Sequence, residues 1–513
     1  MKNRRWLIRI AFLIFSSLIV YRYAVLTMTY EYDDAYITYR YAWNVATYRQ
    51  LTYNLGERVL ATTSPLQAIV LAPFGKLLGR QMLPVVARAS SYFWVLLAGF
   101  VIFECFHRRN DTGFGLIASV SFLLSPYLYI FPGLETNLFI FLLILAIVTF
   151  FSTKWLLAGI VCAVSFLARG DGLCLILILG CKLMVLIYLR ILRATALAKF
   201  SAGASMVLIP WMIFSRAYYG RFLPTTILTK VYQGKSQMFG KTYFASIKDS
   251  LGPSILHTPR PLNILLWVGL LAFLVTVSFQ WSNMISKRQQ RSLQENWQIL
   301  LTLGSLVEFG VLQFIVYSAL GVGGNYRWYQ VPLAFSLTFS MVGMIWALVN
   351  YYRPLSGPSR KVTVVATLLT SIVLVSALYY QNTRMPWNTP PPWTGDLGDA
   401  YLRTAEFLNN NTAKSDVIAL AEAGMIGFYL DRNVFDQFGV VTPQWVRDAI
   451  DNNEWEYPPE TLKVYFRKVS PAWAVNLNRA LDPENYYVEY YCIPTEYKNW
   501  VIRIFRNVSK GYN

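Results

Sequence analysis

The stretch LIRIAFLIFSSLIVYRYAVLTM at 7–28, followed directly by TYEYDDAYITYRYAWN at 29–44, indicates the architecture of the chain. The first segment is an apolar run long enough to cross a bilayer as a helix. The second places two adjacent carboxylates and several tyrosines just after that helix ends. The pattern predicts a membrane span followed by a polar segment at the membrane surface.

The rest of the chain repeats the apolar pattern. Of its 513 residues, 55% are hydrophobic and only 14% are charged, whereas soluble domains carry about 25% charged residues. We therefore expect a polytopic α-helical membrane protein and exclude a soluble cytosolic enzyme. A shorter apolar run at 65–79 predicts an interfacial or re-entrant helix. Eleven spans fit, at roughly 7–28, 88–106, 113–130, 135–151, 155–168, 172–189, 197–214, 262–282, 297–319, 331–350 and 361–380.

The formal net charge of +19 is unevenly distributed. Residues 1–380 hold 33 basic and 11 acidic side chains, whereas residues 381–513 hold 13 and 16. Basic clusters fall at alternate connections between the predicted spans, as expected for loops that face the cytoplasm. The distribution favours a lipid bilayer over nucleic acid as the partner of the basic charge. It predicts a cytoplasmic N-terminus and an extracytoplasmic C-terminal domain.

The chain changes character beyond Tyr380. A Pro-rich linker, MPWNTPPPW at 385–393, predicts a boundary between a transmembrane domain at 1–384, with its first outer loop at 29–87, and a soluble α/β domain at 385–513. In the second domain the pattern predicts helices over 400–411 and 424–430, and strands over 416–421, 472–477, 486–493 and 500–505.

Acidic residues are scarce before residue 380, so their positions are informative. If the segment after the first span is helical, Asp33, Ile37 and Arg40 share one face. Adjacent carboxylates at a membrane surface repel one another, which favours a general base with a partner that tunes it. The structural alternative is a surface ion pair between Asp33 and Arg40. Glu308 lies in the middle of a span, where it is either functional or bonded to Gln313 or Tyr317.

Other connections on the predicted outer side carry polar residues that a turn does not need. For each of them the alternative is structural, either helix capping or a local ion pair between Arg169 and Asp171. Their convergence on one side of the membrane nevertheless predicts a site for a charged amphiphilic ligand, because arginine matches phosphate oxygens. These residues are Glu135, Arg169, Asp171, Arg221, Lys230 and Arg327.

Several motifs together resemble the bacterial AftB-like glycosyltransferases, the family of the mycobacterial terminal β-(1→2) arabinofuranosyltransferase. They are DDAYITYRYAWN at 33–44, YNLGERVLATTSPL at 53–66, PGLET at 132–136, RGDG at 169–172, YYGRFLPTT at 218–226 and GGNYR at 323–327. The resemblance implies a GT-C fold in a bacterial plasma (inner) membrane. It also implies transfer of arabinofuranose from a polyprenyl-phosphate donor to a cell-envelope glycan, with the catalytic carboxylate in the first outer loop.

Inverting transfer from a sugar phosphate requires a base for the acceptor hydroxyl and cations for the leaving phosphate. We expect Asp33 to be the base, with Asp34 and Glu135 orienting it or the acceptor. Arg169, Arg221, Lys230 and Arg327 are the expected phosphate ligands. The expected substrate contacts are Arg40, Tyr41, Asn44, Thr63, Ser64 and Asp171.

The chemistry requires no cofactor. A divalent cation bridging the acids to phosphate is compatible with it, but no ligand spacing calls for a metal. Two other functions remain open: transfer from the same donor to a protein or to lipid A, and a transporter or flippase. The oligomeric state is also open.

Overall fold

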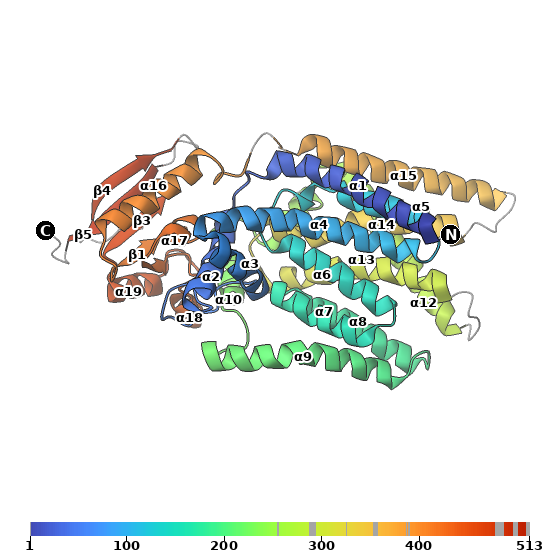
Figure 1. Cartoon of the computed structure of the whole chain (residues 1–513), viewed down its shortest axis with the longest axis horizontal. Coiled ribbons are helices and arrows are strands. Elements are labelled where there is room, and N and C mark those ends of the chain that lie inside the picture. Colours follow the sequence, from blue (N-terminus) through green and yellow to red (C-terminus); the bar gives the residue numbers. More distant parts are fainter. Residues whose placement is uncertain are drawn as a thin grey trace.

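The computed structural model describes residues 2–253, 256–286, 294–324, 326–351, 358–385, 387, 390–477, 487–495 and 501–508. Asn325 of the predicted outer turn and Pro386, Asn388 and Thr389 of the linker lie outside these ranges. Long helices run roughly along the longest axis of the molecule, with a small sheet domain at one end and the N-terminus at the other (Figure 1). We call the end of the bundle that meets the sheet domain the sheet end.

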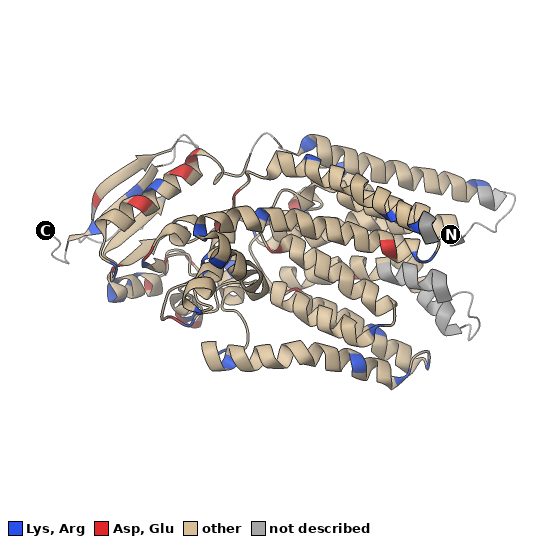
Figure 2. Cartoon of the chain, viewed as in Figure 1, with Lys and Arg blue, Asp and Glu red and all other residues tan. Residues whose placement is uncertain are grey.

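Each of the eleven predicted spans coincides with a helix. Seven of the described helices are long and apolar enough to cross a membrane, and α5 to α8 are shorter apolar helices of the same bundle. Charged residues are sparse along the middle of the described helices (Figure 2). The helices are α1 (Lys2–Thr27), α4 (Leu83–His107), α5 (Thr112–Leu123), α6 (Thr136–Phe151), α7 (Trp155–Ala168), α8 (Gly172–Tyr188), α9 (Ala194–Tyr219), α12 (Arg260–Ser286), α13 (Gln294–Leu320), α14 (Val331–Tyr351) and α15 (Pro358–Arg384).

Short helices cover the sheet end of the bundle. The acidic segment after the first span forms α2 (Asp33–Tyr48), and the predicted interfacial segment forms α3 (Pro65–Leu78), which packs against α2. Two more, α10 (Thr226–Lys235) and α11 (Tyr243–Ser250), follow α9. The polar connections of the chain therefore form a structured layer between the bundle and the sheet domain.

The sheet domain has five strands in the order β2-β1-β3-β5-β4. Strand β1 is parallel to β2 and β3, whereas β5 is antiparallel to β3 and β4. All predicted elements of this region are present, but β2, α18 and α19 were missed. Its elements are α16 (Asp396–Asn411), β1 (Val417–Leu420), α17 (Met425–Tyr429), β2 (Asn433–Asp436), α18 (Gln444–Asp451), α19 (Glu460–Val469), β3 (Trp473–Leu477), β4 (Tyr487–Pro494) and β5 (Val501–Asn507).

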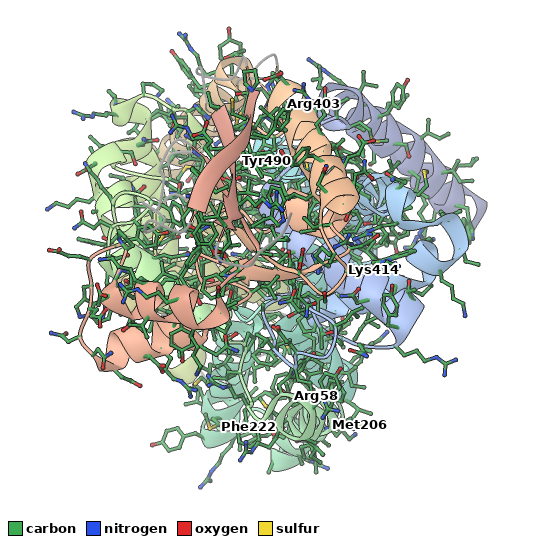
Figure 3. All side chains as sticks on the ribbon, turned by 90° about the vertical axis from the view of Figure 1, so that its left-hand side faces the viewer. Arg58, Met206, Phe222, Arg403, Lys414 and Tyr490 are labelled. Atoms are coloured by element: carbon green, nitrogen blue, oxygen red, sulfur yellow. The ribbon has the colours of Figure 1, made fainter. Side chains whose placement is uncertain are left out.

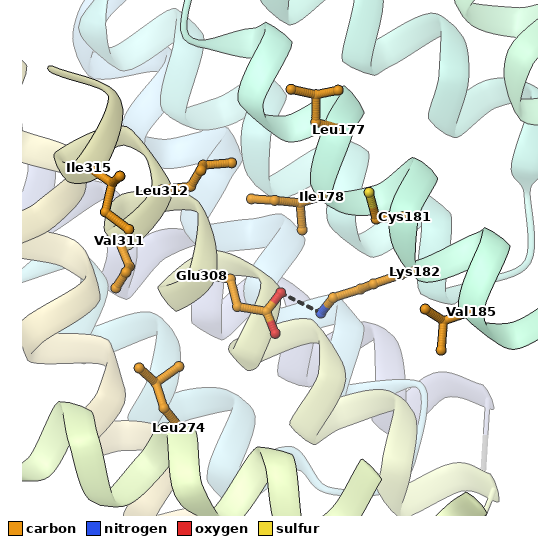
Figure 4. A pocket seen from close by; sticks show the side chains of 10 residues that line it. All are labelled: Leu177, Ile178, Cys181, Lys182, Val185, Leu274, Glu308, Val311, Leu312 and Ile315. Carbon is orange, nitrogen blue, oxygen red and sulfur yellow. Dashed lines mark ion pairs between the residues drawn. The ribbon is translucent and has the colours of Figure 1, made fainter. Parts of the chain in front are cut away.

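Glu308 has a charged partner inside the bundle. Its carboxylate lies 2.7 Å from Nζ of Lys182 on α8, and both side chains line an otherwise apolar cavity of about 500 Å³ (Figure 4). Lys182 also donates a hydrogen bond to Ser305 at 2.7 Å. The suggested bond to Gln313 was wrong, because the amide of Gln313 donates to the carbonyl of Tyr329 instead. The ion pair therefore links α8 to α13.

Glu308→Gln leaves the Lys182 ammonium in an apolar cavity without its counter-charge. Breaking such a pair costs about 3 kcal/mol of stability, so we expect a lower thermal unfolding temperature for the purified protein in detergent. The double variant Lys182→Met/Glu308→Leu removes both charges and should recover most of the loss. A single variant that unfolds at the wild-type temperature would contradict a stabilising role for the pair.

Candidate active site

A cavity of about 200 Å³ lies where α2 and α10 meet the sheet domain. Four carboxylates line it, Asp33 and Asp34 from α2 and Glu422 and Asp436 from the sheet domain, and we call it the acidic cavity. Lys230 of α10 is the only lysine or arginine among the described residues around it. The other lining residues are Ile37, Gln233, Phe239, Tyr326, Trp328, Trp393, Ala421, Ala423, Phe438 and Val440.

The two carboxylates of the sheet domain are placed by its parallel strands. Asp436 is the last residue of β2 and pairs in register with Leu420, the last residue of β1. Glu422 follows β1 by two residues. Parallel strands end at the same edge of a sheet, and α/β sheets bind ligands outside that carboxyl edge. The sheet therefore presents two acids to the bundle.

Asp33 joins the first loop to the sheet domain. Its Oδ1 accepts a hydrogen bond from the backbone N–H of Met425 at 2.6 Å, and its Oδ2 accepts one from Gly424 at 3.0 Å. A Cβ at Gly424 would lie 1.9 Å from the carbonyl oxygen of Asp33, so only glycine permits this approach. The Asp33 carboxylate is thus buried and has a backbone donor on each oxygen.

Arg40, two helical turns further along α2, extends the same contact. Its buried guanidinium donates to four backbone carbonyls: Tyr53 at 2.8 Å, Arg432 at 2.7 Å, Leu430 at 3.4 Å, and Gly427. Three of these carbonyls belong to the sheet domain. The guanidinium is therefore used for docking, and its described contacts do not include the suggested ion pair with the neighbouring carboxylate.

Tyr41 and Asn44, two expected substrate contacts, also stabilise the first loop. The Tyr41 hydroxyl donates to the carbonyl of Val59 at 2.5 Å and accepts from the N–H of Ala61 at 2.8 Å. The Asn44 amide donates to the carbonyls of Thr52 and Tyr53, both at 2.9 Å. Neither side chain is among those that line the cavity.

Asp34 is the more accessible member of the acidic pair. Its side chain is 36% exposed, and its Oδ2 lies 3.5 Å from Nζ of Lys230. The same ammonium lies 3.6 Å from the centre of the Tyr326 ring, a cation–π contact. The cavity therefore brings together a reachable carboxylate and a cation, a pair that the sequence predicted only as separate residues.

Arg169, Asp171 and Glu135 are buried and are not among the residues that line the cavity. Nε of Arg169 lies 2.8 Å from Asp171, which also accepts a hydrogen bond from Tyr317. Glu135 precedes α6 and is close enough to interact electrostatically with Arg169. Arg169 is 2% exposed. This geometry matches the structural alternative for Arg169 and Asp171, a local ion pair.

The remaining predicted residues also lie away from the four acids. Arg327 is exposed, and Arg221 lines a second cavity described below. Ser64 is buried at the start of α3, and Thr63 beside it is half-buried. Of the four expected phosphate ligands, the structure places only Lys230 with Asp33 and Asp34.

The environment makes three acids of the cavity, Asp33, Glu422 and Asp436, hold protons more tightly. Burial raises the pKa of Asp33, and the nearby charge of Glu422 adds to the effect. Burial likewise raises the pKa of Glu422, and it raises the pKa of Asp436 to about 6 although three backbone N–H groups and Lys230 oppose the shift. A cationic or hydrogen-bond-donating ligand would favour the ionised forms.

The described side chains of this cavity do not form a set of metal ligands. Within the described ranges, no three His, Cys, Asp or Glu side chains are grouped closely enough to hold an ion. The carboxylates instead have protein partners: Asp436 accepts from the N–H groups of Phe438, Val440 and Val441.

Glu422 and Asp436 were missed in the sequence. A signal was present, because each follows a short apolar segment, VIAL at 417–420 and NVF at 433–435, as acids at the ends of parallel strands do. Strand β2 has only four residues and was not recognised. Trp393 was seen only as part of a linker, yet its indole donates to Glu422 at 2.8 Å.

Arg40→Lys removes the planar fork that reaches several carbonyls at once, and one ammonium cannot replace it. We expect a loss of about 3 kcal/mol in the free energy of unfolding. Faster limited proteolysis of the sheet domain should accompany a lower unfolding temperature. Arg403→Lys, on the exposed surface of α16, is the matched control. Equal proteolysis rates for both variants would refute the docking role.

Glu422→Gln tests the burial of charge in the cavity. Because the native pKa of Glu422 is raised above 4.5, the native protein keeps a proton that the unfolded chain releases, so stability falls as pH rises above that value. In the variant, the unfolding temperature should fall less steeply between pH 4.5 and 7.5. Glu406→Gln, on the surface of α16, is the control. Parallel curves for Glu422→Gln and wild type would contradict the assignment.

Comparisons with known proteins agree with this architecture. Residues 395–511 match a family described as a domain of unknown function, DUF8728. No curated protein sequence matches the chain. Among solved structures, ArnT from Cupriavidus metallidurans bound to undecaprenyl phosphate is similar at 14% identity and a TM-score of 0.54, over 96% of this chain and 97% of that one. The apo state of the same protein gives 14% and 0.54 over 100% of both chains. The chain therefore has the predicted polytopic GT-C type fold, with a C-terminal α/β domain.

Proposed function

We propose that the chain is an integral-membrane glycosyltransferase that moves a sugar from a polyprenyl phosphate to an acceptor hydroxyl. The observation that carries the proposal is the pairing of Asp34 with Lys230 in a cavity at the sheet end of an apolar bundle. The likeness in fold to ArnT, solved with undecaprenyl phosphate, supports a lipid-phosphate donor. A donor with a polyprenyl tail also explains why the site lies on a membrane bundle.

The reaction is a single displacement at the anomeric carbon. The acceptor oxygen forms the new glycosidic bond, the bond from the anomeric carbon to the phosphate oxygen breaks, and the configuration inverts. The acceptor proton passes to a carboxylate, and the phosphate leaves with the bonding electron pair. Lys230 stabilises the charge that grows on the phosphate. A phosphate is a good leaving group, so the reaction requires no general acid.

Asp34 is the better placed of the two carboxylates to act as the base. A base must be accessible to the acceptor hydroxyl. Both oxygens of Asp33 already accept backbone hydrogen bonds, and its side chain is buried. Asp34 is partly exposed, with the cation of Lys230 beside it. Asp33 then positions α2 against the sheet domain, and Asp34 receives the proton.

The remaining walls suit a sugar. Trp328, Trp393 and Tyr326 offer aromatic faces, which pack against the C–H faces of sugar rings, while Glu422 and Asp436 offer acceptors for hydroxyl groups. The Tyr401 hydroxyl and the Trp393 indole donate to Glu422 and fix its orientation. The pocket therefore provides both contact surface and hydrogen-bond acceptors.

The identity of the sugar and the acceptor rests on the resemblance of the first outer loop. We propose arabinofuranose as the sugar and a cell-envelope glycan as the acceptor. On the same ground we propose the bacterial plasma membrane as the location of the chain. From the distribution of basic residues we infer that the N-terminus is in the cytoplasm and the sheet domain outside. Protein and lipid A remain the alternative acceptors. In this orientation the cavity lies at the outer end of the bundle and takes its donor from the outer leaflet.

Asp34→Asn keeps the shape of the side chain but cannot take a proton. We expect turnover to fall by about 10²–10⁴-fold, with donor binding and unfolding temperature near wild type. The assay uses purified protein in detergent with polyprenyl-phosphate arabinofuranose and polyprenyl-phosphate mannose, and follows release of polyprenyl phosphate by mass spectrometry.

Asp33→Asn serves as the contrasting variant, because it should lower the unfolding temperature as well as turnover. Asp451→Asn, exposed at the end of α18, is the matched control and should behave as wild type. Full turnover by Asp34→Asn would overturn its role as the base. Absence of both turnover and donor binding in the wild-type protein would overturn the proposed activity and favour a transporter.

A further inference from the structure

A second cavity, of about 260 Å³, has the opposite electrostatic character. Arg58 from the first loop, Arg221 from the segment after α9 and Arg447 from α18 all line it. No aspartate or glutamate is among the described residues around it. Three distant parts of the chain thus each contribute one arginine to the same space, which we call the arginine cavity.

The three guanidiniums have no acidic partner in the described part of the chain. None of them takes part in an ion pair there; Arg58 instead lies 4.9 Å from the centre of the Tyr218 ring. Burial and the charge of Arg447 lower the pKa of Arg221, as expected where cations face one another. Clustered cations repel unless an anion lies between them.

The walls of the arginine cavity are fixed by hydrogen bonds. The N–H and hydroxyl of Thr225 donate to the carbonyl of Leu60 at 3.2 and 3.1 Å, which joins the first loop to the start of α10. The hydroxyl of Ser215 donates to the carbonyl of Arg221 at 2.7 Å, and that of Tyr219 to Leu51 at 2.6 Å. The backbone segments near Arg58 and Arg221 are therefore held together by hydrogen bonds.

The position of the cavity relative to α9 indicates what kind of anion it takes. This helix is one of the candidate membrane spans, and Arg221 lies two residues beyond its end. The apolar side chains of Met206 and Ile213 on α9, and of Phe222 after it, are 63%, 64% and 54% exposed. Seen from the sheet domain, Arg58 and Phe222 lie on the side of the molecule occupied by α9 (Figure 3). The arginines thus lie at headgroup depth beside a surface that suits acyl chains.

We propose that the arginine cavity binds the phosphate of an anionic lipid, whose chains lie along the exposed face of α9. The planar fork of each guanidinium matches phosphate oxygens, and the apolar helix face provides the second half of the site. The arginine cavity is separate from the acidic cavity. Thr225 lines the arginine cavity, whereas Lys230 lines the acidic cavity. These residues are five apart, about 7.5 Å along α10. The inference does not depend on the proposed glycosyl transfer.

The test uses the full-length protein, delipidated in detergent, with dioleoyl phosphatidylglycerol as the probe and native mass spectrometry as the readout. Wild type should retain one lipid that survives dilution. In Arg221→Gln/Arg447→Gln the affinity should fall by at least about tenfold for each arginine removed, because charge-assisted hydrogen bonds contribute about 1.5–3 kcal/mol each. Arg403→Gln, on the surface of α16, should bind as wild type, and equal unfolding temperatures show that all variants fold.

Two further ligands separate the lipid headgroup from a soluble phosphate. Glycerol phosphate should bind at least about a hundredfold more weakly, because it lacks the chains that cover α9. Phosphatidylcholine, which is neutral overall, should also bind more weakly. Equal binding of phosphatidylglycerol to wild type and the double variant would overturn the proposal. Equal binding of glycerol phosphate and the lipid would overturn the lipid assignment.

Discussion

A single buried guanidinium, that of Arg40, connects the two ends of the chain, and the acidic cavity depends on it. Its partners at Gly427 and Arg432 are 387 and 392 residues away in the sequence. A buried arginine that donates to four backbone carbonyls is stable only in one arrangement, because each unmade bond leaves a charge or a carbonyl unsatisfied. The first loop and the sheet domain therefore have one relative position, and the acids of both meet in it.

Opposite charges are separated at the sheet end of the bundle. Helix α10 runs between a cavity that holds four carboxylates and one that holds three arginines. Such separation is costly in a low-dielectric environment unless ligands or hydrogen bonds compensate it. In the acidic cavity backbone N–H groups compensate Asp33 and Asp436. In the arginine cavity Arg58 and Arg447 are exposed to solvent and no described acidic side chain lines the cavity, so these cations are available to an anion from outside the chain.

Features that depend on neighbouring residues could be predicted from the sequence. Features that depend on backbone groups far away in the chain could not. Each of the eleven predicted spans coincides with a helix, and seven of the described helices have the length and composition that bilayer thickness requires of a membrane span. The acidic pair was predicted because two adjacent charges are unusual in so apolar a chain. The role of Arg40 was not, because its partners are carbonyls, which carry no signature in the sequence. Glu422 and Asp436 converge only through the parallel register of β1 and β2, which involves a strand of four residues.

The bond from Met425 to Asp33 also orders events during biosynthesis. Asp33 leaves the ribosome among the first residues, and its donor follows 392 residues later. All the helices of the bundle are therefore synthesised before the cavity can close. A chain that stalls or is cut within the bundle therefore lacks the site, because it does not contain the partners of Asp33. The acidic cavity forms only in molecules whose sheet domain has been synthesised and has folded against α2.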